Sequence, residues 1–306
     1  MTGFVAPRPG PHGGDGARLA AALGIDPDEV LDLSVSLNPC APDVAPLVVA
    51  HARVVDRYPD ADAATCALAH AIGVEPERVV LTNGGAEAIA LVASELEAGD
   101  VDACDFSLYA RHLREVVRGS PRWRSNPHNP TGRLAGPAER AAVWDEAFYP
   151  LATGSWTRGE PDSVVVGSLT KLFACPGLRV GYAIAPHAAF AARLHDRQPR
   201  WSVNALACAL VPELLAQCDL PGWAARVAEF RGALDALLRT HGLEPDPSDA
   251  SFVLVRDASG LRDRLAAQGI LIRDTESFGI PGGARIAVPD EAGLERLGRA
   301  LECSGR

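Results

Sequence analysis

Three short apolar segments, each followed at once by a polar turn, constrain the fold of this 306-residue chain more than any other feature. They lie at residues 79–82, 141–144 and 164–166. Apolar runs of this length that end in turn residues are typical of buried strands. The first run leads through Asn83-Gly84-Gly85 into a helical segment at 88–95, which gives the order strand, turn, helix. The pattern predicts an α/β protein with a mostly parallel central sheet.

The pattern changes near residue 200. From Trp201 onward the expected order is two helices, a strand, a helix, two strands and a helix, which describes a small α+β unit with its own sheet. We therefore expect an N-terminal arm at residues 1–30, a large domain at 31–200 that opens with a strand at 31–37, and a small C-terminal domain at 201–306. The chain is long enough to bury a core in each domain.

Composition excludes several classes of function. The net charge is −10 and Lys171 is the only lysine, so the chain has no basic surface for nucleic acid. The seven cysteines are scattered without the spacing of metal ligands, as expected for reduced thiols in the cytoplasm. No segment approaches the roughly 18 consecutive apolar residues of a membrane span, and the N-terminus has no apolar signal region. We expect a cytoplasmic protein with no metal and no membrane or nucleic-acid partner.

Lys171 follows the third apolar run, and its surroundings suggest a chemical role. It comes after the turn Gly167-Ser168-Leu169-Thr170 and shortly before Arg179, which lies in a glycine-containing loop. A lysine that is buried near other cations has a lowered pKa and can attack an aldehyde, while hydroxyl groups and an arginine suit a phosphate. The alternative is a lysine that ends a strand and extends into solvent.

Two other strand ends carry groups that suit the same kind of ligand. The turn Gly84-Gly85-Ala86-Glu87 precedes a helix, and the free N–H groups of a helix start can bind a phosphate. Such glycines also occur in turns for packing alone. Asp145 follows the second apolar run and can hold a protonated ring nitrogen. We interpret Glu146 as a solvated or structural neighbour.

Aromatic and turn residues supply further candidates. Phe106 and Tyr109 can stack on a planar cofactor, although core packing is the commoner role of such rings. The octet 125–132 holds two Asn-Pro turns, which fix asparagine side chains at angles that suit a ligand. Tyr58 lies in a turn before a helix, and it is either a packed loop aromatic or a phosphate donor.

Three more candidates come from turns and from the terminal arm. Asn38 follows the strand expected at 31–37, where polar groups can face a ligand. Arg285 lies on an expected strand, and its guanidinium group either takes a carboxylate or lies on the surface. His12 belongs to an arm rich in proline and glycine that either docks over a site or frays.

Taken in order, these motifs resemble those of the fold-type I pyridoxal-phosphate enzymes of the class I/II aminotransferase group. The resemblance spans most of the chain. It rests on Asn38-Pro39, Tyr58, Gly84-Gly85-Ala86-Glu87, residues 125–132, 145–148 and 168–171, Arg179 and Arg285. It implies a large domain with a mostly parallel central sheet, a small C-terminal α+β domain, and pyridoxal 5′-phosphate as the cofactor.

The resemblance also implies a role for each candidate. Lys171 attaches to the cofactor's aldehyde, Asp145 pairs with its ring nitrogen, and Phe106 stacks on its ring. The remaining cofactor-binding positions are Asn129 at the phenolic oxygen, and Gly85, Ala86, Glu87, Ser168, Thr170 and Arg179 around the phosphate. Tyr58 reaches the phosphate of the partner subunit, so a homodimer with shared sites is implied. The substrate-binding positions are Arg285, Asn38, His12 and Asn129, with Arg285 on the α-carboxylate.

Within this group, the arm with His12 and the segment 31–39 look most like the threonine-phosphate decarboxylases of cobalamin synthesis. The histidinol-phosphate aminotransferases are the sibling group, and both act on phosphorylated amino compounds. The chain departs from the group in a shortened large domain, in which Asp145 comes only 16 positions after Asn129. It also has Phe148 where a tyrosine is common, which favours the decarboxylase branch. The alternatives are an aminotransferase of the histidinol-phosphate type and a cofactor-binding regulatory protein without turnover.

Overall fold

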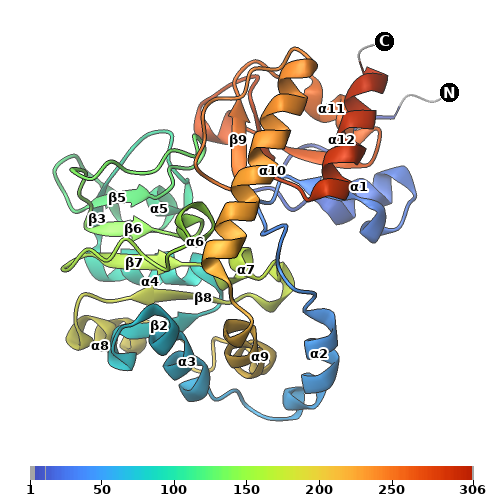
Figure 1. Cartoon of the computed structure of the whole chain (residues 1–306). Coiled ribbons are helices and arrows are strands. Elements are labelled where there is room, and N and C mark those ends of the chain that lie inside the picture. The colour runs from blue at the N-terminus through green and yellow to red at the C-terminus, as the bar shows by residue number, and fades with distance from the viewer. Residues whose placement is uncertain (1–3, 11, 305–306) are drawn as a thin grey trace.

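A computed structural model describes residues 4–10 and 12–304 of the chain, and these residues form two sheets with helices around them. The seven-stranded sheet and the four-stranded sheet occupy separate parts of the molecule (Figure 1). The long helix α10 (Leu220–Thr240) extends from one part to the other: its first turns pack into a core of the larger sheet, and its last turns pack into the core of the smaller sheet. The α/β fold class is confirmed, with a larger, mostly parallel sheet and a smaller one toward the C-terminus.

The larger sheet has the strand order β2-β8-β7-β6-β5-β3-β4. The bounds are Val79–Thr82 (β2), Gly181–Ile184 (β8), Val164–Gly167 (β7), Val143–Asp145 (β6), Arg122–Ser125 (β5), Ala98–Val101 (β3) and Glu115–Val116 (β4). The pairs formed among β3, β4, β5, β6 and β7 are all parallel, whereas β8 is antiparallel to both of its neighbours, β2 and β7. The carboxyl ends of β5, β6 and β7 therefore meet at one edge, where Ser125 pairs with Asp145 and Asp145 with Val166.

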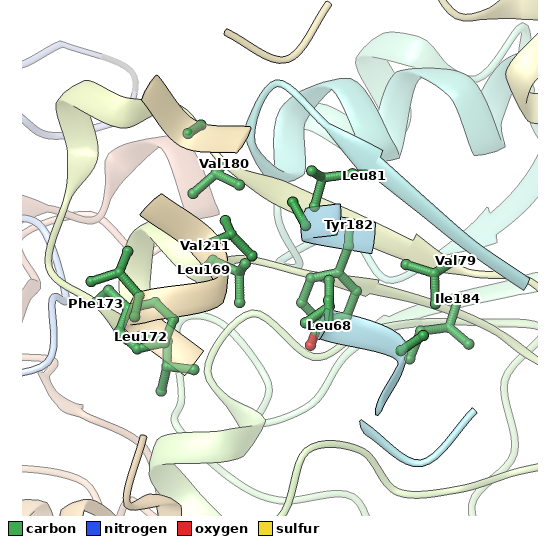
Figure 2. Packing of buried hydrophobic residues seen from close by; sticks show 14 of the residues in the cluster. Leu68, Val79, Leu81, Leu169, Leu172, Phe173, Val180, Tyr182, Ile184 and Val211 are labelled. Carbon is green, nitrogen blue, oxygen red and sulfur yellow. The ribbon is translucent and has the colours of Figure 1, made fainter. Parts of the chain in front are cut away.

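Helices cover both faces of this sheet. They are α2 (Ala45–His51), α3 (Asp62–Ile72), α4 (Gly84–Leu96), α5 (Leu108–His112), α6 (Tyr149–Thr153), α7 (Leu169–Leu172), α8 (Ala188–Arg197) and α9 (Ala205–Ala216), with short 3₁₀ turns at Ala52–Asp56, Pro76–Arg78 and Pro176–Leu178. Val80 packs into a core with α4, α5 and α8, whereas its neighbours Val79 and Leu81 pack into a second core with α3, α7 and α9. Figure 2 shows this second core, with Tyr182 of β8 beside Leu68 of α3. Burial on both faces explains why the strands appear as unbroken apolar runs.

The smaller sheet has the order β1-β10-β11-β9. Its strands are Leu31–Leu33 (β1), Ile270–Asp274 (β10), Ala284–Ala287 (β11) and Phe252–Val255 (β9). Its surrounding helices are α1 (Gly16–Leu23), α10, α11 (Leu261–Ala266) and α12 (Glu291–Ser304), with 3₁₀ turns at Pro27–Glu29 and Glu276–Phe278. Strand β1 is parallel to β10, and the other two pairs are antiparallel.

The elements near the expected domain boundaries differ from the prediction. The strand expected at 31–37 to open the large domain is only Leu31–Leu33, and it pairs with β10 of the smaller sheet. Leu33 is buried in the core of that sheet. Conversely, α9 lies after residue 200 but packs into the core of the larger sheet. Alternating apolar residues predict a strand but not the sheet that it joins, so sequence could not settle either point.

The large domain is predicted to be shortened between Glu87 and Asn126 and between Asn129 and Asp145; the first span holds most of α4, with β3, α5, β4 and β5, and the second is a loop. Residues 117–121 join β4 to β5, and residues 126–142 join β5 to β6 without a helix among these described residues. Arg158 holds this loop together. Its guanidinium group donates to the carbonyl oxygens of Ala135, Gly136 and Glu139, and its Cζ lies 4.8 Å from the centre of the Trp144 ring. Across residues 4–10 and 12–304, the helices all lack the length or the apolar character needed to cross a membrane.

Candidate active site

Lys171 lies on α7, directly after the carboxyl end of β7. The neighbouring Leu169 and Leu172 anchor this short helix in the core (Figure 2). Asn38 holds it from the other side, because its side-chain amide donates to the Leu172 carbonyl at 2.9 Å and its backbone N–H donates to the Lys171 carbonyl at 3.0 Å. The side chain of Asn38, predicted to bind substrate, therefore already supports the backbone around the lysine.

The environment of Lys171 favours a reactive amine. Burial, and to a smaller extent the nearby guanidinium groups of Arg285, Arg179 and Arg273, together lower the pKa of Lys171 to about 8. Among the described residues, no carboxylate lies within ion-pair distance of this amine. A neutral amine is the form that attacks an aldehyde, and the lowered pKa makes more of it available near neutral pH than an ordinary lysine would have.

Asp145 is the last residue of β6 and is buried. Its Oδ2 accepts a hydrogen bond of 2.7 Å from the Tyr109 hydroxyl, and its Oδ1 accepts one of 3.1 Å from the Ala147 N–H. Burial raises the pKa of Asp145 to about 6, although these hydrogen bonds and Lys171 act in the opposite direction. The adjacent Glu146, expected to be solvated or structural, is fully buried and accepts from the Arg158 N–H at 3.1 Å, so its role is structural.

The start of α4 forms an anion-binding cradle with Arg179. Gly84 has a φ of 75°, and a Cβ there would overlap Nη2 of Arg179, so the guanidinium group lies against the helix N-terminus. Gly85 and Ala86 follow in the first turn, and a Cβ on Gly85 would lie 3.8 Å from Cβ of Ser168. Free N–H groups, a helix dipole and an arginine suit a phosphate. The backbone of Arg179 itself is left-handed, with φ 53°, a conformation that is often stored at functional sites.

Two predicted phosphate-binding residues have other partners. The Thr170 hydroxyl donates to the Val180 carbonyl at 3.0 Å and accepts from the Val180 N–H at 3.3 Å, which ties the lysine turn to the Arg179 loop. The Glu87 carboxylate accepts from the Asn83 N–H at 2.7 Å and so caps α4. Both side chains thus have local backbone partners, and their role at the cofactor stays a prediction.

Asn129, from the loop after β5 of the larger sheet, and Arg285, from β11 of the smaller sheet, meet in the site. Arg285, on β11, donates from Nη1 to Oδ1 of Asn129 at 2.7 Å and from Nη2 to the Ser34 carbonyl at 3.1 Å. Its guanidinium carbon lies 4.8 Å from the centre of the Phe252 ring, and burial lowers its pKa to about 9. Arg285 is 5% exposed, so it is not a surface arginine.

Sequence reasoning missed Arg273. It lies on β10 directly across from Arg285 and is 4% exposed, and burial lowers its pKa to about 10. In the sequence, only the presence of an arginine within the apolar strand 270–274 could have indicated a buried functional residue. Without the pairing of β10 with β11, however, nothing placed it beside Arg285.

The N-terminal arm lies against the site. The Gly14 N–H donates to the Ser34 hydroxyl at 2.9 Å, and this bond brings His12 to the Phe106 ring, with ring centres 5.7 Å apart in an edge-on arrangement. Burial, Arg273 and Arg111 lower the pKa of His12. The arm is therefore docked at this point.

Tyr58 lies apart from these residues. It is 75% exposed and stacks on Trp201, with ring centres 4.4 Å apart. No contact with another predicted site residue is recorded for it in the described part of the chain. A role at the phosphate would require that a second copy of the chain bring it there.

The assembled residues fit a phosphorylated aldehyde cofactor held on a lysine. Lys171 supplies the amine, Asp145 a buried carboxylate, and the start of α4 with Arg179 a cradle for the phosphate. Three buried polar atoms near these groups lack a hydrogen-bond partner among the described residues: Nδ1 of His12, the hydroxyl of Ser36 and Nε of Arg285. No group of metal-ligating side chains occurs within residues 4–10 and 12–304.

Comparisons with known proteins agree with this assignment. Residues 103–301 match the family described as aminotransferase class I and II. The chain is 32% identical to threonine-phosphate decarboxylase of Salmonella typhimurium, with 95% of each chain covered. It is 29% identical to histidinol-phosphate aminotransferase 1 of Dechloromonas aromatica, with 93% of this chain and 92% of the relative covered.

A solved structure has the same fold. It is histidinol-phosphate aminotransferase of Sinorhizobium meliloti in complex with pyridoxal-5′-phosphate, with a TM-score of 0.82 at 20% identity, covering 98% of this chain and 96% of the other. The chain belongs to the class I and II aminotransferase family. The resemblance inferred from the motifs is confirmed, and pyridoxal 5′-phosphate is the cofactor of this family of enzymes.

Proposed function

We propose that this enzyme removes the carboxylate from a phosphorylated amino acid, as a threonine-phosphate decarboxylase of cobalamin biosynthesis does. The observation that carries the proposal is the group of three arginines around Lys171, of which Arg285 and Arg273 are buried and Arg179 is exposed. Arg285, Arg179 and Arg273 all lower the pKa of Lys171, and Arg273 lowers that of Arg285. The cofactor phosphate accounts for Arg179. A substrate with both a carboxylate and a phosphate would offset the charge of the remaining pair of arginines.

The side chains of the site have separate tasks under this proposal. Arg285, oriented by Asn129, binds the substrate carboxylate, and Arg273 with His12 takes the substrate phosphate. Pyridoxal phosphate, when bound, accepts the electron pair released at the substrate's α-carbon. Asp145 holds the proton on the ring nitrogen, and Lys171 delivers a proton to the α-carbon after the carboxylate has left.

Phe148 supports the decarboxylase branch. Its ring packs edge-on against Phe252, with centres 5.2 Å apart, and Phe252 in turn lies beneath the guanidinium group of Arg285. Phe148 therefore supports the substrate arginine through this stack. It carries no hydroxyl group for the cofactor oxygen, in contrast to the tyrosine that the aminotransferase pattern leads one to expect.

We also infer that the enzyme is a homodimer with shared sites. Four large side chains are more than half exposed: Val49 at 76%, Val55 at 64%, Tyr58 at 75% and Trp201 at 60%, and Tyr58 stacks on Trp201. A second copy docked on them would bury this surface and could deliver Tyr58 to the neighbouring cradle. Analytical ultracentrifugation of wild type and Val55→Arg tests this, and a monomeric wild type contradicts it.

The reaction is tested with O-phosphothreonine and enzyme loaded with pyridoxal phosphate, with and without 2-oxoglutarate. Mass spectrometry that finds aminopropanol phosphate without the keto acid supports the decarboxylase. Products that appear only with the keto acid, together with glutamate, assign an aminotransferase instead. If loaded protein shows no near-visible absorbance from a lysine-bound cofactor, the enzyme assignment fails and a regulatory role gains support.

A further inference from the structure

Tyr109 is a buried phenol with no role so far in the proposed reaction. It lies on α5 and is fully buried, and its hydroxyl donates to Oδ2 of Asp145 at 2.7 Å. The other oxygen of Asp145 accepts from the Ala147 N–H at 3.1 Å. Tyr109 thus provides the only side-chain hydrogen bond to Asp145 recorded among the described residues.

Two aromatic neighbours fix the Tyr109 ring. The Phe106 ring meets it edge-on, with centres 5.8 Å apart and an angle of 82° between the planes. The Trp123 ring lies on it at 5.5 Å with a tilt of 39°. Because Phe106 is the residue expected to stack on the cofactor, Tyr109 connects that stacking ring to the carboxylate expected at the ring nitrogen.

The chemistry of this contact is that of a fixed neutral donor. Burial and the negative charges of Asp145 and Asp105 hold the pKa of Tyr109 well above its usual range, so the hydroxyl keeps its proton. A phenol that cannot ionise donates to the carboxylate at every working pH. A hydrogen bond of this kind stabilises the ionised carboxylate and opposes the effect of burial.

We propose that Tyr109 is a positioning residue that keeps Asp145 ionised and directed at the cofactor's ring nitrogen, and so maintains the proton on that nitrogen. Without the phenol, Asp145 becomes a stronger base, and the shared proton moves from the ring nitrogen to the carboxylate. The inference rests on the cofactor of the family and on Asp145 as its ring-nitrogen partner. It does not depend on which reaction the enzyme performs.

The test compares Tyr109→Phe with Tyr149→Phe. Phenylalanine preserves the packing of Tyr109 and removes only the hydroxyl. Tyr149 lies on α6 and lines a separate cavity beside Ala141 and Ser163, near the amino ends of β6 and β7, so its variant removes a phenol away from Asp145. Each protein is loaded with pyridoxal phosphate labelled with ¹⁵N at the ring nitrogen. The ¹⁵N resonance reports whether this nitrogen is protonated.

We expect the ¹⁵N resonance of Tyr109→Phe to move toward that of a neutral pyridine, while Tyr149→Phe matches wild type. Loss of a hydrogen bond to a charged group should weaken cofactor binding by about 10- to 100-fold. kcat should fall by more than KM changes, because the ring nitrogen acts after substrate has bound.

A second measurement separates this role from core packing. In 1-deazapyridoxal phosphate a C–H group replaces the ring nitrogen, so Asp145 has no proton to share with it. Tyr109→Phe and wild type should then bind this analogue with the same affinity. An unchanged ¹⁵N resonance, or an affinity loss that is equal for both cofactors, would overturn the proposal. Failure of Lys171 to bind the cofactor at all would instead refute the proposed function.

Discussion

Replacement of Gly84 by alanine tests the phosphate cradle most directly. Gly84 has a φ of 75°, and an added Cβ would overlap Nη2 of Arg179 and lie 3.0 Å from its Cζ. Gly73, at the end of α3, offers a matched control with a φ of 83° and no atom within 4 Å of the added Cβ. Both substitutions strain the backbone in the same way, but only Gly84→Ala displaces the guanidinium group.

The expected magnitudes follow from this difference. A left-handed backbone costs a residue with a Cβ about 1–2 kcal/mol, so both variants should lose about that much free energy of unfolding. Displacement of Arg179 from the phosphate removes a charge-assisted hydrogen bond worth about 1.5–3 kcal/mol. Gly84→Ala should therefore bind pyridoxal phosphate about 10- to 100-fold more weakly, while Gly73→Ala keeps the wild-type affinity.

Two assays separate the effects. Urea unfolding of the cofactor-free proteins gives the free energy of unfolding, and titration with pyridoxal phosphate, followed by its near-visible absorbance, gives Kd. If Gly84→Ala binds the cofactor as tightly as Gly73→Ala does, Arg179 and the start of α4 do not hold the phosphate, and the placement of the cofactor is wrong.

Three further predictions concern the lysine and the shortened region. Lys171→Ala should abolish the near-visible absorbance of the loaded protein, and a retained band would contradict the role of this amine. The lowered pKa of Lys171, about 8, means that neutral amine accumulates as the pH rises through that value. The rate of cofactor binding to cofactor-free enzyme should therefore rise most steeply around pH 8 and level off above about pH 9. Stopped-flow absorbance measures this rate, and a rate that still climbs steeply above about pH 10 would disagree. Arg158→Ala removes the donor to several loop carbonyls and an ion pair with Glu160, so it should lower the free energy of unfolding in urea by about 3 kcal/mol. The exposed control Arg226→Ala should lower it by only about 0–1 kcal/mol. Equal losses would mean that Arg158 does not support the loops.

The predicted site could be found from sequence because its groups stand at strand and helix ends. Asp145 ends β6, Lys171 follows β7, and Gly84 begins α4. A parallel sheet brings such ends to one edge whatever the intervening lengths, so a local pattern was enough to gather them. The same reasoning predicts that Thr170 and Glu87 bind the cofactor, and in the structure their side chains also have local partners, Val180 and Asn83. Local sequence gives a residue's position on an element but not which of several nearby partners its side chain takes.

The N-terminal segment shows a different limit. Leu31–Leu33 were expected in the large domain because they precede it in the chain, yet β1 completes the smaller sheet beside β10. This pairing sets the position of Ser34, whose carbonyl accepts from Arg285 and whose hydroxyl accepts from the Gly14 N–H of the arm. The pairing of β1 with a strand nearly 240 residues away in sequence thus supports Arg285, and no local motif indicates it.

The sequence by itself determined the fold class and the cofactor of the family, and it predicted the reactive lysine, because each depends on residue types at short, fixed spacings within one strand, turn or helix. Only the tertiary structure decided that Arg273 lies beside Arg285, that Tyr109 donates to Asp145, and that the arm brings His12 to Phe106. These contacts join segments from different elements, and in the case of Arg285 and Asn129 they join a strand of the smaller sheet to the loop after β5 of the larger one. Their geometry arises from strand order and packing, which a pattern of residues along the chain does not contain.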